Sequence, residues 1–245
     1  MTHPSKVRSS GLPKRVLVTG GGTGLGLAIA MALVEAGSEV FICGRRRRVL
    51  EEAAEISGAT PLSGDITGPP DGLLRATGQI DGLVHNAGSY IHSEIGDWTA
   101  HSWQDMFAVH VRGPAILSQA FAAQCEGPGS IVAISSTLGA RPAAGAAAYS
   151  AAKAGMLSLI RSLAIELAPV GIRANAILAG VVPTDMTATP RGNMTSEEQL
   201  EVLRRLHPLG RLGKPEEIAQ AVLGLMGNPW VSGAELAVDG GLLVS

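Results

Sequence analysis

A tyrosine and a lysine spaced four residues apart, Tyr149 and Lys153, are the residues in this sequence best suited to acid–base chemistry. They lie in Ala143–Pro169, a run rich in good helix formers, and residues four apart share one face of a helix. An ammonium about 4 Å from a phenol, at an effective dielectric near 20, favours the phenolate by roughly 4 kcal/mol, or about three pKa units. The pair therefore predicts a tyrosine that acts as general acid or base near neutral pH, although the same spacing also fits an ordinary helix face.

A glycine-rich turn lies upstream, between a predicted strand at Arg15–Thr19 and a predicted helix at Leu25–Ala36. With a second predicted strand at Glu39–Cys43 it forms a unit typical of parallel βαβ structure. In such a unit, glycines let a pyrophosphate approach the backbone, and free amides at the helix N-terminus attract its charge. The predicted phosphate-binding residues are Gly20, Gly22, Thr23, Gly24, Leu25 and Gly26. Their T-G-x-x-x-G-x-G spacing differs from the usual G-x-G-x-x-G and from a P-loop.

Strands and helices alternate along the rest of the chain. The pattern predicts one α/β domain over residues 14–245, with a Rossmann-type doubly wound parallel sheet of seven strands and helices on both faces. Residues 1–13 are polar and are expected to form a flexible tail. The polar segment Thr184–Pro208 interrupts the alternation, which suggests an insertion over one edge of the sheet. Long helices are expected at Ser102–Cys125 and around Tyr149.

Composition excludes several classes of protein. Hydrophobic residues make up 46% of the 245 residues and the formal net charge is −2, which favours a large core and argues against a general nucleic-acid binder. The two cysteines are expected to be buried free thiols, and no metal site is expected because His92, His101 and His207 lack metal-ligand spacing and are interpreted as surface residues. Without an apolar span or signal core, the chain is expected to be cytoplasmic and not bound to a membrane.

Eight short motifs occur in an order that is typical of one family. They are T-G-G-G-T-G-L-G at Thr19–Gly26, Gly64-Asp65-Ile66, H-N-A-G at His85–Gly88, I-S-S at Ile134–Ser136, Y-S-A-A-K at Tyr149–Lys153, I-R-A-N at Ile172–Asn175, P-E-E-I-A at Pro215–Ala219 and V-D-G-G at Val238–Gly241. Over Arg15–Gly241 the chain therefore resembles the short-chain dehydrogenase/reductase family, and within it the 3-oxoacyl-acyl-carrier-protein reductases.

The resemblance assigns expected catalytic roles. Tyr149 would donate a proton to the carbonyl oxygen of the substrate, and Lys153 would lower its pKa and contact the nicotinamide ribose. Ser136 matches the serine that hydrogen-bonds the substrate oxygen, whereas Ser135 is expected to be structural. His110 stands where the family usually has an asparagine that helps hold a water in a proton relay. Imidazole can also bind water, so His110 is either a relay residue or a helix residue that only packs.

The resemblance also implies a nicotinamide cofactor. No acidic residue follows the second strand, where Gly44, Arg45 and Arg46 stand, so NADP(H) is expected to be preferred, with NAD(H) possible. A solvated basic helix start is the other interpretation of these arginines. The remaining expected cofactor contacts are Asp65, Ile66, Asn86, Ala87, Gly88, Gly180, Val182 and Thr184, together with Tyr149 and Lys153. Ala179-Gly180 departs from the family's Pro-Gly, and Gly180 is expected to keep the conformational freedom of that turn.

The leading hypothesis is an NADP(H)-dependent oxidoreductase acting on a ketone or 3-oxoacyl compound and its secondary alcohol. Candidate pocket residues are Tyr90, Thr137, Leu138, Val181 and the segment Met186–His207, and few charges are expected in the pocket itself. Tyr90 fits a surface aromatic equally well. A catalytically weak NADP-binding sensor or scaffold is the alternative that His110 suggests. A hydrolase using Ser150-x-x-Lys153 is a third, disfavoured because its partner motifs are absent. Apolar residues on the two long helices predict a homotetramer or dimer.

Overall fold

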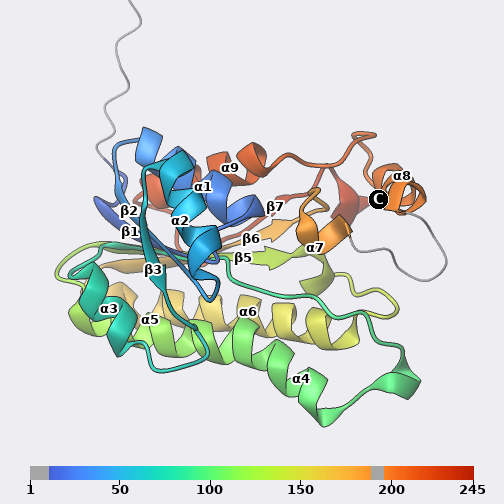
Figure 1. Ribbon diagram of the computed structural model, residues 1–245, viewed down its shortest axis with the longest axis horizontal. Helices are drawn as coiled ribbons and strands as arrows, with labels where there is room; N and C mark the ends of the chain where they lie inside the picture. The colour runs from blue at the N-terminus through green and yellow to red at the C-terminus, as the bar shows by residue number, and fades with distance from the viewer. Residues whose placement is uncertain (1–10, 189–195) are drawn as a thin grey trace, which may run out of the picture.

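A seven-stranded parallel sheet forms the centre of the computed structural model, which describes residues 11–188 and 196–245 (Figure 1). The strand order is β3-β2-β1-β4-β5-β6-β7. It reverses direction between β1 and β4, which makes the sheet doubly wound and confirms the predicted fold class. The strands are β1 (Arg15–Thr19), β2 (Glu39–Gly44), β3 (Thr60–Ser63), β4 (Gly82–His85), β5 (Gly129–Ser136), β6 (Ile172–Ala179) and β7 (Glu235–Val238).

Helices cover both faces of the sheet, as Figure 1 shows. On one face α1 (Gly24–Glu35), α2 (Arg47–Ser57) and α9 (Pro215–Gly227) bury residues such as Ile29, Leu50 and Val222 against β1 and β5. On the other face α3 (Asp71–Thr77), α5 (Gly113–Gln124) and α6 (Ala147–Glu166) bury Phe121 and Met156. The five inner strands are buried on both faces, which explains their continuous apolar runs, whereas the edge strands β3 and β7 are partly exposed.

The long helix predicted at Ser102–Cys125 is three consecutive segments. It begins as α4 (Ala100–Phe107), where the Thr99 side chain accepts a hydrogen bond from the Ser102 amide at 3.0 Å and caps the first turn. It widens into a π-helical turn at Ala108–Arg112 and continues as α5. Such a turn inserts one extra residue and re-aims its side chains. His110 lies at the centre of this turn.

The segment predicted as an insertion contains α7 (Asp185–Ala188) and α8 (Ser196–Arg205) in its described parts. Its Met186 and Leu203 line the cavity described below, so this part of the insertion lies beyond the carboxyl end of β6. Positions 189–195 of the same segment lie outside the described residues.

Two further sequence expectations concern the chain's beginning and its cysteines. Of the predicted tail 1–13, residues 1–10 lie outside the described residues, whereas Pro13 is buried and accepts a hydrogen bond from the Ser38 hydroxyl at 2.7 Å. Both cysteines are free, as expected, but only Cys43 is fully buried and Cys125 is partly exposed. Over 11–188 and 196–245, no helix is long and apolar enough to cross a membrane.

Candidate active site

A cavity of about 1150 Å³ opens at the carboxyl ends of the parallel strands. This is the position at which doubly wound sheets bind ligands. The cavity collects residues from the glycine turn, from the chain after β2 to β6 and from α6. All the sequence-predicted site residues line it except Gly26, which packs behind the turn.

The glycine turn is shaped by contacts that exclude side chains. Gly20 has φ +64°, and a Cβ there would lie 2.8 Å from the Cα of Ala87. A Cβ on Gly26 would lie 2.1 Å from the carbonyl oxygen of Gly20, so α1 approaches the turn as closely as glycine allows. The Asn86 amide donates to the carbonyl oxygens of Thr19 and Gly20 at 3.0 and 3.1 Å. Asn86 therefore ties the turn to the end of β4.

Thr19 is a part of this site that sequence reasoning missed. Its buried hydroxyl accepts hydrogen bonds from the backbone amides of Asn86 and Ala87, both at 3.0 Å, and donates to the carbonyl oxygen of Val84 at 3.1 Å. The bonds join the ends of β1 and β4, where the strand order reverses. A threonine at the end of a β-branched strand gave no signal of this role in sequence.

The four consecutive arginines after β2 divide into two pairs. Arg47 and Arg48 lie on α2 and form i,i+4 ion pairs with Glu51 and Glu52, each at 2.8 Å. Arg45 and Arg46 line the cavity and form no ion pair with any described residue. The two that face the cavity are thus the ones available to an anion.

Asp65 lies near the same end of the cavity. Hydrogen bonds from Thr67, first from its backbone amide at 2.9 Å, hold the pKa of the Asp65 carboxyl below its usual value, and the charge of Arg45 adds to the effect. The carboxylate is therefore ionised at neutral pH and is bound within its own turn.

Tyr149 and Lys153 lie together on the first turns of α6 and are 8% and 4% exposed. The Lys153 Nζ lies 5.6 Å from the centroid of the Tyr149 ring and donates a hydrogen bond to the carbonyl oxygen of Ile134 at 2.8 Å. Burial lowers the pKa of Lys153 to about 7 from an ordinary value of 10.5. An ammonium kept in this position costs free energy, which is typical of a functional group.

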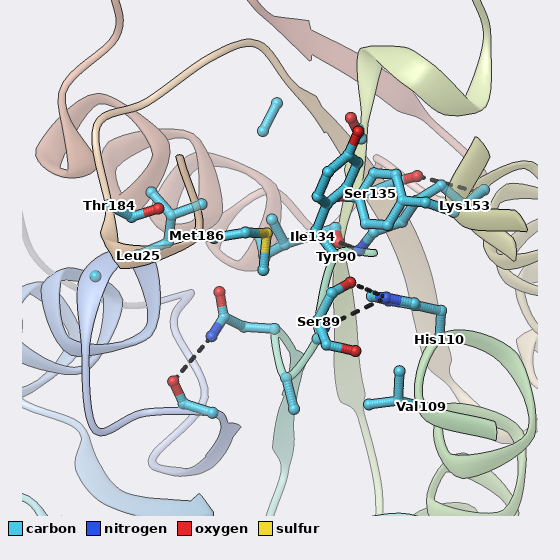
Figure 2. Close-up of a pocket in the computed structure, with 18 of the residues that line it drawn as sticks. Leu25, Ser89, Tyr90, Val109, His110, Ile134, Ser135, Lys153, Thr184 and Met186 are labelled. Atoms are coloured by element: carbon cyan, nitrogen blue, oxygen red, sulfur yellow. Dashed lines mark hydrogen bonds between the residues drawn. The ribbon is translucent and has the colours of Figure 1, made fainter. Parts of the chain in front are cut away.

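His110 contacts the same tyrosine from the π-helical turn. Its ring lies edge-on to Tyr149, with centroids 5.3 Å apart, and is fully buried. Figure 2 shows the ring facing Ser89, whose carbonyl oxygen lies 2.8 Å from Nε2, with a second contact of 3.5 Å to the Ser89 amide. Because a carbonyl oxygen only accepts, the shorter bond puts the proton on Nε2. Nδ1 is then a bare acceptor, and it has no protein partner among the described residues.

The imidazole of His110 is neutral. Burial lowers its pKa to about 3, and the charge of Lys153 acts in the same direction. Gly88 makes room for the ring, since a Cβ there would lie 2.6 Å from the Cε1 of His110. The sequence left two interpretations of His110, a helix residue that packs and a residue of a proton relay. The structure shows that the ring packs, and Nδ1, which has no partner among the described residues, is the atom that a relay would use.

The two serines after β5 have different surroundings. Ser135 is buried and donates to the carbonyl oxygen of Lys153 at 3.2 Å, in keeping with the structural role expected of it, and it also lines the cavity. Ser136 lines the cavity, and its Oγ accepts a hydrogen bond from the Leu138 amide at 3.1 Å. No described protein group accepts the hydroxyl proton of Ser136, so it remains available to a ligand oxygen.

One end of the cavity is shaped by the chain after β6. Ala179 is the last residue of that strand, and Gly180 has no positive φ, so the expectation that Gly180 supplies conformational freedom is wrong. Glycine is required there for space, because a Cβ would lie 2.7 Å from the Cα of Asp239. Val182 is buried in the core, and Thr184 faces the glycine turn, with its Cγ2 3.1 Å from a Cβ built on Gly24.

The part of the cavity lined by the predicted pocket residues is mostly apolar. The predicted residues Thr137, Leu138 and Val181 line it, as does Tyr90, whose ring packs edge-on to Tyr149 with centroids 5.2 Å apart and so is not a surface aromatic. The residues that sequence reasoning missed come from the chain after β4, from the loop before α6 and from the chain after β7. They are Ser89, Ile91, Arg141, Pro142, Ala143, Ala144, Leu242, Leu243 and Ser245.

Two of the three histidines interpreted as surface residues are exposed, and the third is not. His92 and His101 form contacts of 3.3 Å with Glu94 and Asp105 at the surface. His207 is only 3% exposed, so its surface assignment is wrong. The described residues contain no group of three or more His, Cys, Asp or Glu side chains that would hold a metal ion.

Comparison with known proteins places nearly the whole chain in one group of enzymes. A family model described as enoyl-(acyl carrier protein) reductase matches residues 20–243. The chain is 34% identical over 243 residues to 2-(S)-hydroxypropyl-CoM dehydrogenase 3 of Xanthobacter autotrophicus, covering 93% of this chain and 95% of the relative. It is 34% identical over 242 residues to the 3-oxoacyl-acyl-carrier-protein reductase FabG of Aquifex aeolicus, covering 92% and 96%.

A solved structure gives the same result for the fold. The crystal structure of a short-chain type dehydrogenase/reductase from Mycobacterium marinum is similar with a TM-score of 0.87 at 28% identity. The match covers 95% of this chain and 96% of the other. The motifs, the fold and the relatives therefore agree over nearly the full length.

Proposed function

Because the chain belongs to the short-chain dehydrogenase/reductase family of oxidoreductases, we propose that it transfers a hydride between NADP(H) and a carbonyl compound or its secondary alcohol, with Tyr149 as general acid and base. The observation that carries the proposal is the meeting of Tyr149, Lys153 and Ser136 in one cavity with the glycine turn. The nicotinamide would supply or accept the hydride. The protein would position the carbonyl and handle its proton.

The residues around the glycine turn fit a dinucleotide. Side chains are excluded at Gly20 and Gly26, which leaves a backbone surface at the N-terminus of α1 where free amides favour a pyrophosphate. Asp65 and Ile66 would flank the adenine, and Asn86 would hold the turn behind the phosphates. Thr184, which faces the turn, would reach the carboxamide of the nicotinamide.

The proton chemistry would rest on three neighbouring groups. Ser136 has a hydroxyl proton free to bind the substrate oxygen, and Tyr149 would donate its proton to that oxygen during reduction. Lys153, held by Ile134, would stabilise the phenolate that results. His110 would accept a hydrogen bond from a water at Nδ1, and such a water would pass protons towards Lys153.

Arg45 and Arg46 support a preference for NADP(H). They face the cavity without ion-pair partners among the described residues, whereas their neighbours Arg47 and Arg48 are already paired. A 2′-phosphate bound by one arginine gains a charge-assisted hydrogen bond worth about 1.5–3 kcal/mol. Arg45→Ala should therefore raise the KM for NADPH by about 10- to 100-fold and leave the KM for NADH nearly unchanged, with Arg48→Ala as the matched control.

The substrate is proposed to be a ketone or a 3-oxoacyl compound. Relatives are named for both classes, including a cyclopentanol dehydrogenase of Comamonas testosteroni and the acetoacetyl-CoA reductase of Synechocystis. Apolar side chains such as Leu138, Met186 and Leu203 form the substrate side. The test is a panel of cyclic ketones, β-ketoesters and acetoacetyl-CoA with NADPH and with NADH.

The same panel tests the alternative function. A sensor or scaffold would bind NADPH tightly and reduce no member of the panel, whereas the proposed enzyme turns over at least one. The hydrolase hypothesis has no support at Ser150, because this residue is buried and does not line the cavity.

We also propose association through α4, α5 and α6, where Phe107 and Ile116 are exposed, and light scattering should give a dimer or tetramer.

A further inference from the structure

His207 is a buried polar group that the proposed chemistry does not use. It lies in the turn directly after α8, a region of exposed and charged residues, yet it is 3% exposed. It does not line the cavity, although Leu203 and Leu206 just before it do. Burying a histidine costs free energy of folding unless both of its ring nitrogen atoms form hydrogen bonds.

Both nitrogen atoms of His207 have backbone partners of opposite kinds. Nδ1 lies 2.7 Å from the carbonyl oxygen of Leu203, and Nε2 accepts a hydrogen bond from the amide of Val181 at 3.2 Å. A carbonyl only accepts and an amide N–H only donates, so the proton is on Nδ1 and the lone pair is on Nε2. The ring is thus a neutral bridge of fixed tautomer between the end of α8 and the chain after β6.

The bridge joins two segments that form the same wall. Val181, Leu203 and Leu206 all line the substrate side of the cavity. Val181 is itself held by the Gly213 amide, which donates to its carbonyl oxygen at 2.9 Å. Gln199 supplies a second link at the other end of α8 by donating to the carbonyl oxygen of Thr187 at 3.1 Å. Without His207, the end of α8 loses its bond to Val181, and the next bond to the fixed part of the fold is the one from the Leu209 amide to the carbonyl oxygen of Gly240 at 3.1 Å.

We propose that His207 is a positioning residue that holds the apolar wall of α8 against the cavity and thereby sets affinity for the carbonyl substrate. It takes no part in proton or hydride transfer. The proposal rests on the proposed function, because the wall is the substrate side only if the cavity binds a carbonyl compound. It assigns to His207 an effect on substrate KM and none on kcat or on cofactor affinity.

The test compares His207→Leu with His207→Gln, using NADPH and ethyl acetoacetate as the probe. Leucine removes both hydrogen bonds, and each contributes a factor of about 2 to 10, so the KM for the ketoester should rise by about 4- to 100-fold. The kcat and the KM for NADPH should stay within about twofold. Glutamine carries one donor and one acceptor and should restore most of the affinity. His101→Leu, at an exposed histidine on α4, is the matched control and should change nothing.

Hydrogen exchange of residues 196–206 gives a readout that does not need turnover. Exchange in this segment should increase in His207→Leu and return towards the wild-type rate in His207→Gln. If the wild type reduces no ketone, the proposed function fails while the exchange result still decides the role of His207. Unchanged substrate KM and unchanged exchange in His207→Leu would overturn the inference, as would a loss of kcat at constant KM. If His207→Leu does not fold, His207→Asn, whose side chain reaches only Leu203, takes its place and should raise the KM.

Discussion

Replacing Lys153 by methionine should stabilise the protein while it abolishes activity. Burial lowers the pKa of Lys153 from 10.5 to about 7, and a difference of about 3.5 units corresponds to roughly 5 kcal/mol of cost for the buried ammonium. Methionine removes this cost but leaves the Ile134 carbonyl without its 2.8 Å donor, a loss of about 1–3 kcal/mol. The net gain of about 2–4 kcal/mol should raise Tm by at least about 4 °C in a chain of this size.

The gain from Lys153→Met should depend on pH in a defined direction. Below pH 7 the lysine is protonated in both the folded and the unfolded state, so the full cost of burial is present. Between pH 7 and 10.5 the folded state loses the proton while the unfolded chain keeps it, and the stability of the wild type rises. The difference in Tm between the variant and the wild type should therefore be largest below pH 7 and shrink towards pH 10.

Thermal unfolding followed by circular dichroism at pH 6.5, 8 and 9.5 measures this difference, and reduction of the ketone panel measures activity. Activity should fall by at least about 100-fold. Arg48→Met, which removes an exposed cation on α2, is the control and should give no gain at any of these pH values. The conclusion that burying the Lys153 ammonium costs free energy would be refuted by either of two results. One is a variant less stable than the wild type at pH 6.5, and the other is a Tm difference that does not change with pH.

Two glycine substitutions test the shape of the site. Gly26→Ala places a Cβ 2.1 Å from the Gly20 carbonyl oxygen. This variant should bind NADPH more than about 10-fold more weakly, as measured by fluorescence titration. The matched control is Gly224→Ala on α9, where nothing lies within 4 Å of the added Cβ. Gly88→Ala places a Cβ 2.6 Å from the His110 ring and should lower kcat by about 10-fold with a smaller change in NADPH affinity. Wild-type kinetics in Gly88→Ala would show that the position of His110 is irrelevant to turnover.

The fold was predictable from sequence because its signals are local. The β-branched run Arg15–Thr19 has the same bounds in the structure as predicted from sequence, since this strand is buried and is followed by a glycine turn. The π-helical turn at Ala108–Arg112 was not predicted. A wide turn of only five residues is too short to give a periodic pattern of its own, and it is stabilised by tertiary contacts such as the bond between His110 and Ser89.

Site residues could be predicted from sequence only where they belong to a recognisable motif. Tyr149, Lys153 and the glycine turn follow from spacing, whereas Leu242 and Leu243 line the cavity from almost a hundred residues further along the chain. His207 shows the same limit. The arginines near it in sequence, Arg204, Arg205 and Arg211, suggest exposure, but its hydrogen-bond partners include Val181, which only the folded sheet brings close to it.

The role of Tyr149 is tested most directly by Tyr149→Phe, which removes one oxygen atom from a buried ring. Reduction of the best ketone of the panel should slow by at least about 100-fold, while the Kd for NADPH, measured by fluorescence titration, should stay within about threefold of the wild-type value. Turnover at the wild-type rate in this variant would contradict the account, because the carbonyl oxygen would then take its proton from another group.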